Sequence, residues 1–233
     1  MARHDDLSRR PLVVVPVGAF EQHGPHLPLD TDSVIAVALV EHALARLGED
    51  ARADVFVAPV IAISASDEHV GFAGTLSAGT EATAAALSGI ARSARSWSRG
   101  VLFVNGHGGN ADALVAASRT LSAEGVPHAL WWPTLPDDAR SDMHAGRTET
   151  SAMLHLQPDA VDLSRAVPGA TGEPEALIAA MRKGGVAAVS PNGVIGDPTL
   201  ATAAEGEAIV AQWAEALAAV LDAHRVAWAP PQT

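Results

Sequence analysis

Short, continuously apolar runs alternate along the chain with longer stretches of helical periodicity. The apolar runs are rich in valine, which is typical of strands buried on both faces of a parallel sheet. They predict strands at 12–17, 55–63, 101–104 and about 128–132. The longer stretches predict helices at about 31–47, 80–97, 111–123, 147–156 and 205–224. This alternation predicts an α/β fold, in which helices cover both faces of a mostly parallel sheet.

Polar loops follow the first three predicted strands, at 18–30, 64–77 and 105–110. The carboxyl ends of parallel strands lie at one edge of the sheet, and open α/β folds form their binding sites there. Residues 31–33 offer side chains that could cap the first helix. The segment 161–189 is rich in glycine and alanine, and its pattern does not identify an element. We therefore expect a site where the three polar loops meet.

The composition favours one folded domain. Apolar residues make up 48% of the 233 residues, and a chain of this length can bury a full core. We expect a single domain over 1–233, with flexible ends at 1–10 and at the proline-rich 229–233. No internal repeat is visible.

Charge and cysteine content exclude several classes of function. The chain has 27 acidic and 15 basic residues, so its formal net charge is −12. Without a basic patch, we expect no nucleic-acid partner. The absence of cysteine excludes disulfides, thiolate zinc sites and cysteine nucleophiles. The first residues carry no apolar signal-peptide core, and no apolar run approaches the length of a membrane span. We expect a cytoplasmic protein with no membrane partner.

The first polar cluster contains Glu21, His23 and Asp32. Residues two apart in an extended segment point to the same side, so Glu21 and His23 can face one point. Asp32 falls at a predicted helix N-terminus, where a carboxylate is favoured. These ligand types suit a divalent ion. The alternative is a polar turn with a surface histidine.

The second cluster places His107 among glycines, between a predicted buried strand and a helix. Gly108 and Gly109 let the backbone approach a ligand, and amides at a helix start can bind an anion or a developing oxyanion. Asn110 completes the cluster as a candidate substrate contact. The alternative is a flexible glycine-rich turn with an idle histidine.

Two further clusters offer candidate residues. His144 precedes a predicted helix whose first turn holds Glu149, although a carboxylate there is also favoured by the helix dipole alone. Ser66, Glu68 and His69 lie in the loop after the second strand. Adjacent residues point apart in a strand, so Glu68 and His69 are expected to contact the substrate or to support the metal ligands rather than to bind one ion together.

Taken jointly, the clusters predict a centre with two divalent ions. Three carboxylates and two imidazoles are available. Two divalent ions bring four positive charges, and the three carboxylates balance three of them, which leaves one positive charge. Such a pair of ions lowers the pKa of water and polarises a carbonyl, which is amide-hydrolysis chemistry. Asp32 is the candidate to bridge the ions. Zinc, iron and manganese all accept these ligands, so the metal is left open.

Five ordered motifs now identify a resemblance. The chain resembles the creatininase family of metal-dependent amidohydrolases over about residues 13–206. The motifs that carry the resemblance lie at 17–28 with Thr31 and Asp32, at 68–75, at 105–110, at 144–151 and at 193–203.

The resemblance implies a three-layer α/β/α sandwich, a dinuclear metal centre and a homo-oligomer. By motif position, Glu21, Asp32 and His107 would hold one metal. His23 and Asp32 would hold the other.

The chain departs from creatininase itself at one position. There, a glutamate two positions after the histidine of the third motif completes the second metal site, and here that position is Gly109. The departure argues against creatinine as substrate. Glu149 is the natural replacement ligand and could also act as an acid or base, while His144 matches a family histidine that would protonate the leaving nitrogen.

Within the family, the short length and the Ala/Arg-rich composition are most similar to the branch of peptidases that trim the mycofactocin precursor peptide. We therefore expect a short peptide substrate, cleaved near its modified C-terminus. The first alternative is a small-molecule amidohydrolase acting on a cyclic amide or formamide in a closed pocket, gated by Trp131 or Trp132. The second alternative is a non-catalytic binding module.

Overall fold

The computed structural model describes residues 10–134 and 142–228. The predicted flexible ends therefore lie outside the described residues, except for Arg10. Four strands form one parallel sheet in the order β2-β1-β3-β4. The strands are β1 (Leu12–Val17), β2 (Val55–Val57), β3 (Gly100–Asn105) and β4 (His128–Trp131).

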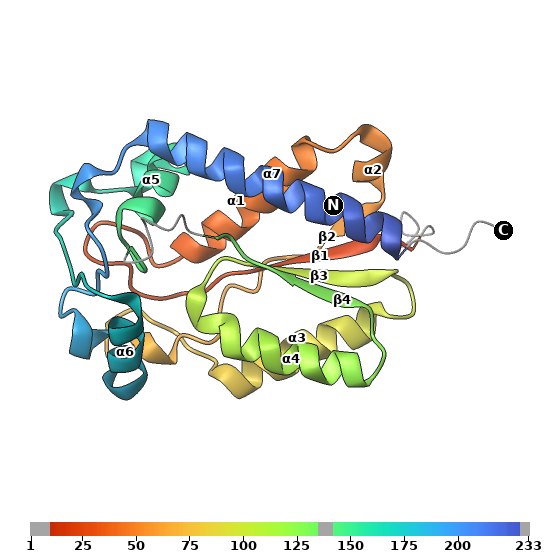
Figure 1. The fold of residues 1–233 in the computed structure, drawn as a ribbon, viewed down its shortest axis with the longest axis horizontal. Coiled ribbons are helices and arrows are strands. Elements are labelled where there is room, and N and C mark those ends of the chain that lie inside the picture. The colour runs from red at the N-terminus through yellow and green to blue at the C-terminus, as the bar shows by residue number, and fades with distance from the viewer. Residues whose placement is uncertain (1–9, 135–141, 229–233) are drawn as a thin grey trace.

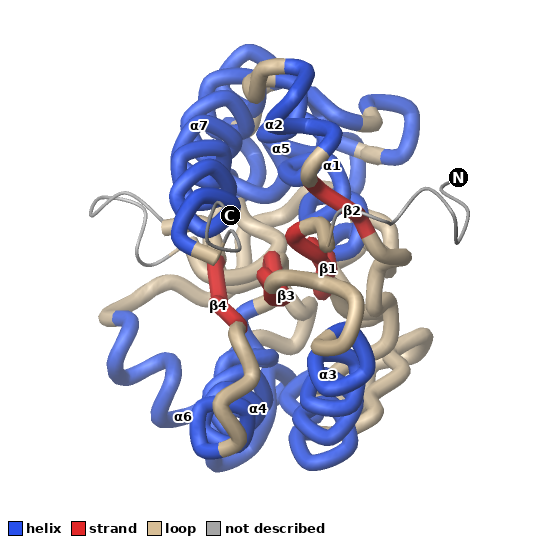
Figure 2. Tube along the Cα trace, turned by 90° about the vertical axis from the view of Figure 1, so that its right-hand side faces the viewer, coloured by secondary structure: helices blue, strands red, loops and turns tan. Residues whose placement is uncertain are grey.

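Helices cover both faces of the sheet, so the predicted three-layer α/β/α architecture is confirmed (Figure 1). One layer contains α1 (Thr31–Ala45), α2 (Glu49–Ala53), α5 (Arg147–Leu156) and α7 (Ala203–Ala227). The opposite layer contains α3 (Thr80–Ala94), α4 (Ala111–Ala123) and α6 (Pro174–Val189). Figure 2 shows the strands nearly end-on between these two layers.

The two central strands alternate their side chains between two apolar cores. Val14 and Leu102 belong to the core beneath α1, α5 and α7. Val13 and Phe103 belong to the core beneath α3 and α4. All four side chains are buried. Because successive residues of a strand point to opposite faces, a strand covered on both sides must be apolar throughout, as the sequence pattern indicated.

Two parts of the sequence-based assignment are wrong. The strand predicted at 55–63 ends at Val57, since Pro59 follows and cannot donate to the ladder; only a bridge between Val17 and Ile61 continues the pairing. The side chains at 31–33 do not cap α1: Thr31 Oγ1 donates to the Pro28 carbonyl instead, and Asp32 is buried. Both ends of α4 and α5 are as predicted, whereas the predicted C-terminal ends of α1 and α3 and both ends of α7 differ from the observed ones by two or three residues.

Helix α6 lies in the segment whose pattern identified no element. Its backbone is interrupted at Gly185, which has φ 71° and ψ 179°. The break lies against η2, a short 3₁₀ turn at Asp67–His69 in the loop after β2. A Cβ at Gly185 would be 2.9 Å from the Glu68 carbonyl oxygen, so the glycine permits this close contact.

The loops that follow β1, β2 and β3 meet at one edge of the sheet. The Gly106 amide donates to Val17, the last residue of β1, and Asn110 links the Gly18 carbonyl to the Ala65 amide. This edge is where open α/β sheets place their sites. Among the described residues, no helix combines the length and apolarity that crossing a membrane requires.

Candidate metal centre

Four elements deliver buried ligand-type side chains to this edge. Glu21 and His23 follow β1, Asp32 lies in the first turn of α1, and His107 follows β3. These four side chains are all at most 5% exposed. Glu149, in the first turn of α5, retains 21% exposure. Asp32 and Glu149 thus lie at helix N-termini, where the dipole favours their charge.

Asp32 lies between two imidazoles and presents one oxygen to each. Its Oδ1 is 3.2 Å from His23 Nε2, and its Oδ2 is 3.3 Å from His107 Nδ1. Two ligands held at about 2.0–2.2 Å by one tetrahedral ion lie about 3.3–3.6 Å apart. Each oxygen of Asp32 and its facing nitrogen are therefore spaced to share one ion.

The second nitrogen of each imidazole contacts a backbone carbonyl. His23 Nδ1 lies 3.1 Å from the Glu21 carbonyl, and His107 Nε2 lies 3.0 Å from the Ala65 carbonyl. A carbonyl only accepts, so these nitrogens carry the proton. The nitrogen that can release its proton and bind a cation is then the one that faces Asp32. Such carbonyl contacts are the usual way in which metal-binding histidines are oriented.

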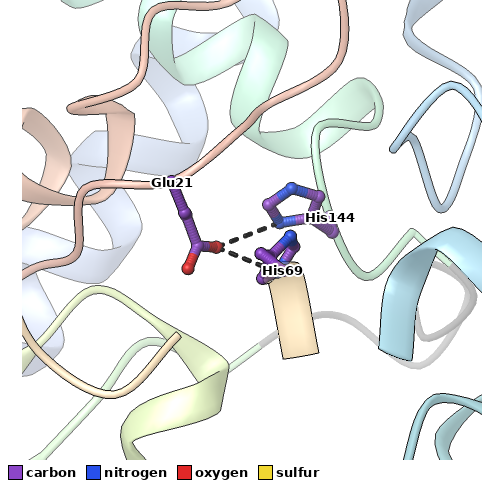
Figure 3. A group of neighbouring side chains, drawn as sticks. All are labelled: Glu21, His69 and His144. Carbon is purple, nitrogen blue, oxygen red and sulfur yellow. Dashed lines mark ion pairs between the residues drawn. The ribbon is translucent and has the colours of Figure 1, made fainter. Parts of the chain in front are cut away.

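Glu21 contributes a carboxylate that lies among three imidazoles. Its Oε1 is 3.1 Å from His69 Nε2 and 3.7 Å from His144 Nδ1, as Figure 3 shows. Its Oε2 is 3.2 Å from His107 Nε2. Among the described residues, neither oxygen of Glu21 nor Asp32 Oδ2 has a hydrogen-bond partner of good geometry. A buried carboxylate oxygen without a partner is costly, and a bound cation would remove that cost.

Gln22 holds the two imidazoles that face Glu21. Its side-chain amide donates to His69 Nδ1 at 2.8 Å, which leaves the proton of His69 on Nε2, facing Glu21. The backbone carbonyl of Gln22 accepts from His144 Nε2 at 2.8 Å, which leaves His144 Nδ1 free. Sequence reasoning missed this role of Gln22. Its position between Glu21 and His23 was the only available signal.

Glu149 approaches the centre from α5. Its Oε2 lies 3.9 Å from His23 Nε2 and accepts from the Ala145 amide at 2.6 Å. Ala145 has a φ of 52°, which is uncommon for a residue with a side chain. That turn points the amide at the Glu149 carboxylate.

The pKa values of the carboxylates and imidazoles of the centre shift in different directions. Burial raises the pKa of Glu21 to about 8 and that of Glu149 to about 7. Burial alone lowers the pKa of His23 and of His107, but the neighbouring carboxylates outweigh it and raise both to about 10. Burial, together with the imidazoles of His23 and His69, holds the pKa of His144 well below its usual range.

This donor set fits divalent cations. Glu21, His23 and Asp32 each offer an atom within 4.8 Å of the other two. His23, His144 and Glu149 form a second such group. Imidazole nitrogen and carboxylate oxygen are ligands for zinc, manganese and iron.

A cavity of about 440 Å³ opens beside the centre. Its polar wall includes His107, Gly108, Gly109, His144 and Glu149, all of which are sequence-predicted site residues. Helix α6 also lines the cavity, with the apolar Ile178, Met181 and Val186 and the charged Arg182. A cavity with both apolar and polar lining residues is typical of a site that orients an organic substrate.

Four other sequence-predicted residues do not line the cavity, although Ser66 lies beside Glu21. Asn110 is buried and bonds to Gly18 and Ala65, so it joins two loops. Ser66 is buried in the loop before η2. Trp131 packs against the apolar core and Trp132 is 43% exposed. Among the described residues that line the cavity, neither tryptophan occurs.

Glu68 and His69 both face the centre, contrary to the expectation that they point apart. They lie in the 3₁₀ turn η2, not in a strand, so their side chains do not alternate. His69 Nε2 reaches Glu21, and Glu68 Oε1 lies 3.4 Å from His107 Nε2. Burial raises the pKa of Glu68, but its interactions with His107 outweigh this and hold the pKa below its usual range.

Comparison with known proteins identifies a family. The family described as creatininase, creatinine amidohydrolase, matches residues 2–221. The mycofactocin precursor peptide peptidase of Mycolicibacterium smegmatis is 52% identical over 202 residues, which cover 87% of this chain and 81% of that protein. The creatinine amidohydrolase of Pseudomonas putida is 29% identical over 192 residues, covering 70% and 72% of the two chains.

Solved structures share the fold. A creatininase with a tryptophan-to-phenylalanine mutation superposes with a TM-score of 0.76 at 25% identity, covering 99% of this chain and 98% of that one. A creatininase described as Zn-Zn type has a TM-score of 0.74, and one described as the Mn form has 0.73.

Proposed function

The chain belongs to the creatininase family, and from that premise we propose that it is a metal-dependent peptidase. It hydrolyses an amide bond near the C-terminus of a modified ribosomal precursor peptide, in mycofactocin maturation. The observation that carries this proposal is the 52% identity to a peptidase named for that substrate, against 29% to a creatinine amidohydrolase.

We propose that two divalent ions bind at the candidate metal centre. Glu21, Asp32 and His107 would hold one ion, and His23, Asp32 and Glu149 the other. The facing pairs His23 Nε2–Asp32 Oδ1 and His107 Nδ1–Asp32 Oδ2 support this division. When bound, the ions would lower the pKa of water and polarise the scissile carbonyl. The metal is zinc, manganese or iron, and solved creatininases described as Zn-Zn and Mn forms support the first two.

We assign the proton transfers of the hydrolysis to His144. Its Nε2 donates to Gln22, so its Nδ1 is free and faces the centre. This atom takes a proton from the attacking water and then gives it to the nitrogen of the leaving amine, which balances the hydrolysis. The low pKa of His144 keeps Nδ1 unprotonated before substrate reacts.

The cavity walls position the substrate. Gly108 and Gly109 line the cavity from the 3₁₀ turn before α4, and we assign their backbone amides to the oxyanion that develops during attack on the carbonyl. Ile178 and Met181 of α6 offer apolar side chains beside the site. A peptide side chain gains more from such a wall than creatinine or formamide does, because it buries more apolar area.

A comparison of substrates tests the proposed function. The metal-loaded protein is incubated separately with the modified precursor peptide, with creatinine and with formamides, and products are identified by mass spectrometry. We expect cleavage near the peptide's C-terminus and none of the small amides, with Asp32→Ala inactive. Turnover of a small amide without peptide cleavage would support the alternative function. Fewer than one ion per chain after metal supplementation would support a non-catalytic binding module.

We also propose that the protein works as a homo-oligomer, as its family resemblance implies. Light scattering coupled to size exclusion measures the mass directly. A mass of 23.9 kDa at working concentration would contradict this.

A further inference from the structure

Gly109 leaves a space that another residue fills. A Cβ at position 109 would overlap Glu68 Oε1 and His107 Nε2, and would lie 2.8 Å from Glu68 Cδ. At the neighbouring Gly108, a Cβ would meet nothing within 4 Å. The carboxylate of Glu68 therefore occupies the volume that a side chain at 109 would take.

Glu68 reaches this space because of local backbone structure. The turn η2 turns both Glu68 and His69 toward the centre, and the break at Gly185 in α6 lets that helix pack closely on the Glu68 carbonyl. The Glu68 side chain retains only 27% exposure. Glu68 and His107 both line the cavity.

Glu68 faces the proton-bearing nitrogen of His107 and not the nitrogen that faces Asp32. Glu68 Oε1 is 3.4 Å from Nε2, the nitrogen that donates to the Ala65 carbonyl and that also lies 3.2 Å from Glu21 Oε2. The other nitrogen, Nδ1, faces Asp32. A carboxylate on the proton-bearing side of a metal-binding imidazole fixes the ring and makes the opposite nitrogen a better ligand.

The charge balance also favours a role for Glu68. Glu21, Asp32 and Glu149 supply three negative charges to a mostly buried centre. Two divalent ions bring four positive charges, and uncompensated buried charge is costly. Glu68 would be the fourth carboxylate. Glu68 thus places a fourth negative charge in the space that Gly109 leaves open.

We propose that Glu68 is a positioning residue of the metal centre, lodged in the space left by Gly109, where it orients His107 and supplies the fourth negative charge. This inference rests on the proposed metal centre but not on the identity of the substrate. It assigns Glu149 and Glu68 different tasks: Glu149 lies near His23, on the ligand side, and Glu68 acts through His107.

Zinc titration of the metal-free full-length protein tests this proposal. Glu68→Gln keeps the shape of the side chain and removes its charge, and Glu68→Asp keeps the charge on a shorter side chain. Asp112→Asn is the matched control, because Asp112 is an exposed carboxylate that lines the same cavity. Calorimetry with a competing chelator gives the number of zinc ions and the affinity, and thermal unfolding of each metal-free variant checks the fold.

We expect Glu68→Gln to weaken zinc binding about 10- to 100-fold, Glu68→Asp to retain most of the affinity, and Asp112→Asn to bind within about twofold of wild type. Wild-type affinity in Glu68→Gln would overturn the proposal. An equal loss in Gln and Asp variants would also overturn it, because shape rather than charge would then matter. The titration contains no substrate, so failure of the proposed peptidase activity would be seen separately, as absence of cleavage by the zinc-loaded wild type.

Discussion

Adding a single methyl group at Gly109 perturbs the centre without removing any ligand. In Gly109→Ala, the new carbon overlaps Glu68 Oε1 and His107 Nε2, and it lies 2.8 Å from Glu68 Cδ against 3.4–4 Å for ordinary van der Waals contact. The carboxyl carbon must therefore move by at least about 0.6 Å, and the imidazole must also shift. Metal–ligand distances tolerate only about 0.2 Å.

The cost of this overlap can be estimated. Forcing an extra methyl into a packed site costs about 1–3 kcal/mol. If that cost falls on the metal-bound arrangement, zinc affinity drops roughly 5- to 150-fold. Gly108→Ala is the matched control, because its methyl group meets nothing within 4 Å and should leave the affinity unchanged.

The assay is calorimetric titration of zinc into the metal-free forms of both variants. We expect a clear loss for Gly109→Ala and none for Gly108→Ala. Equal affinities in the two variants would refute the argument that Glu68 and His107 are packed over Gly109.

Four further predictions address the proton, the pH dependence and the packing. His144→Ala should lower kcat about 10²- to 10⁴-fold with metal content unchanged, as measured by steady-state kinetics and elemental analysis; an unchanged kcat would exclude its proton role. Zinc binding at pH 7.5 should release roughly three protons, one each from His23 and His107 and about one more from Glu21 and Glu149 together, so the calorimetric heat should vary with the ionisation enthalpy of the buffer. In the metal-free protein the pKa of each of these imidazoles is raised, so the stability that they contribute is complete below about pH 6.5 and is lost as pH rises through about 10. We therefore expect the Tm to fall over that range, and a Tm that rises would contradict this. In Gly206→Ala the new methyl group would overlap the Ser151 carbonyl oxygen, so the free energy of unfolding, measured by urea denaturation, should fall by about 1–3 kcal/mol. In Gly89→Ala, at an exposed position of α3, the free energy of unfolding should rise by about 0.5–1 kcal/mol.

The sequence predicts the sheet well where one physical constraint dominates. Strands β1 and β3 are covered on both faces, so their continuous apolar runs identify them directly. Helix α6 escapes prediction because Gly184 and Gly185 interrupt its pattern, and its structure depends on packing against η2.

The sequence predicts which residue types form the candidate site, but it does not predict all of their contacts. Glu21, His23 and His107 stand out because glycines and proline surround them in loops after strands. The roles of Gln22 and Glu68 could not be predicted, because they depend on contacts with residues 39 or more positions away. A 3₁₀ turn, which the pattern does not reveal, decides where Glu68 points.

The proposed metal centre depends most on Asp32 binding two cations. Crystals grown with zinc or manganese and measured at the absorption edge of the metal locate each ion directly. We expect two anomalous peaks, one about 2.0–2.2 Å from His23 Nε2 and Asp32 Oδ1, and one at similar distances from His107 Nδ1 and Asp32 Oδ2. A fully loaded protein with no peak within bonding distance of Asp32, or with a single peak there, would contradict it.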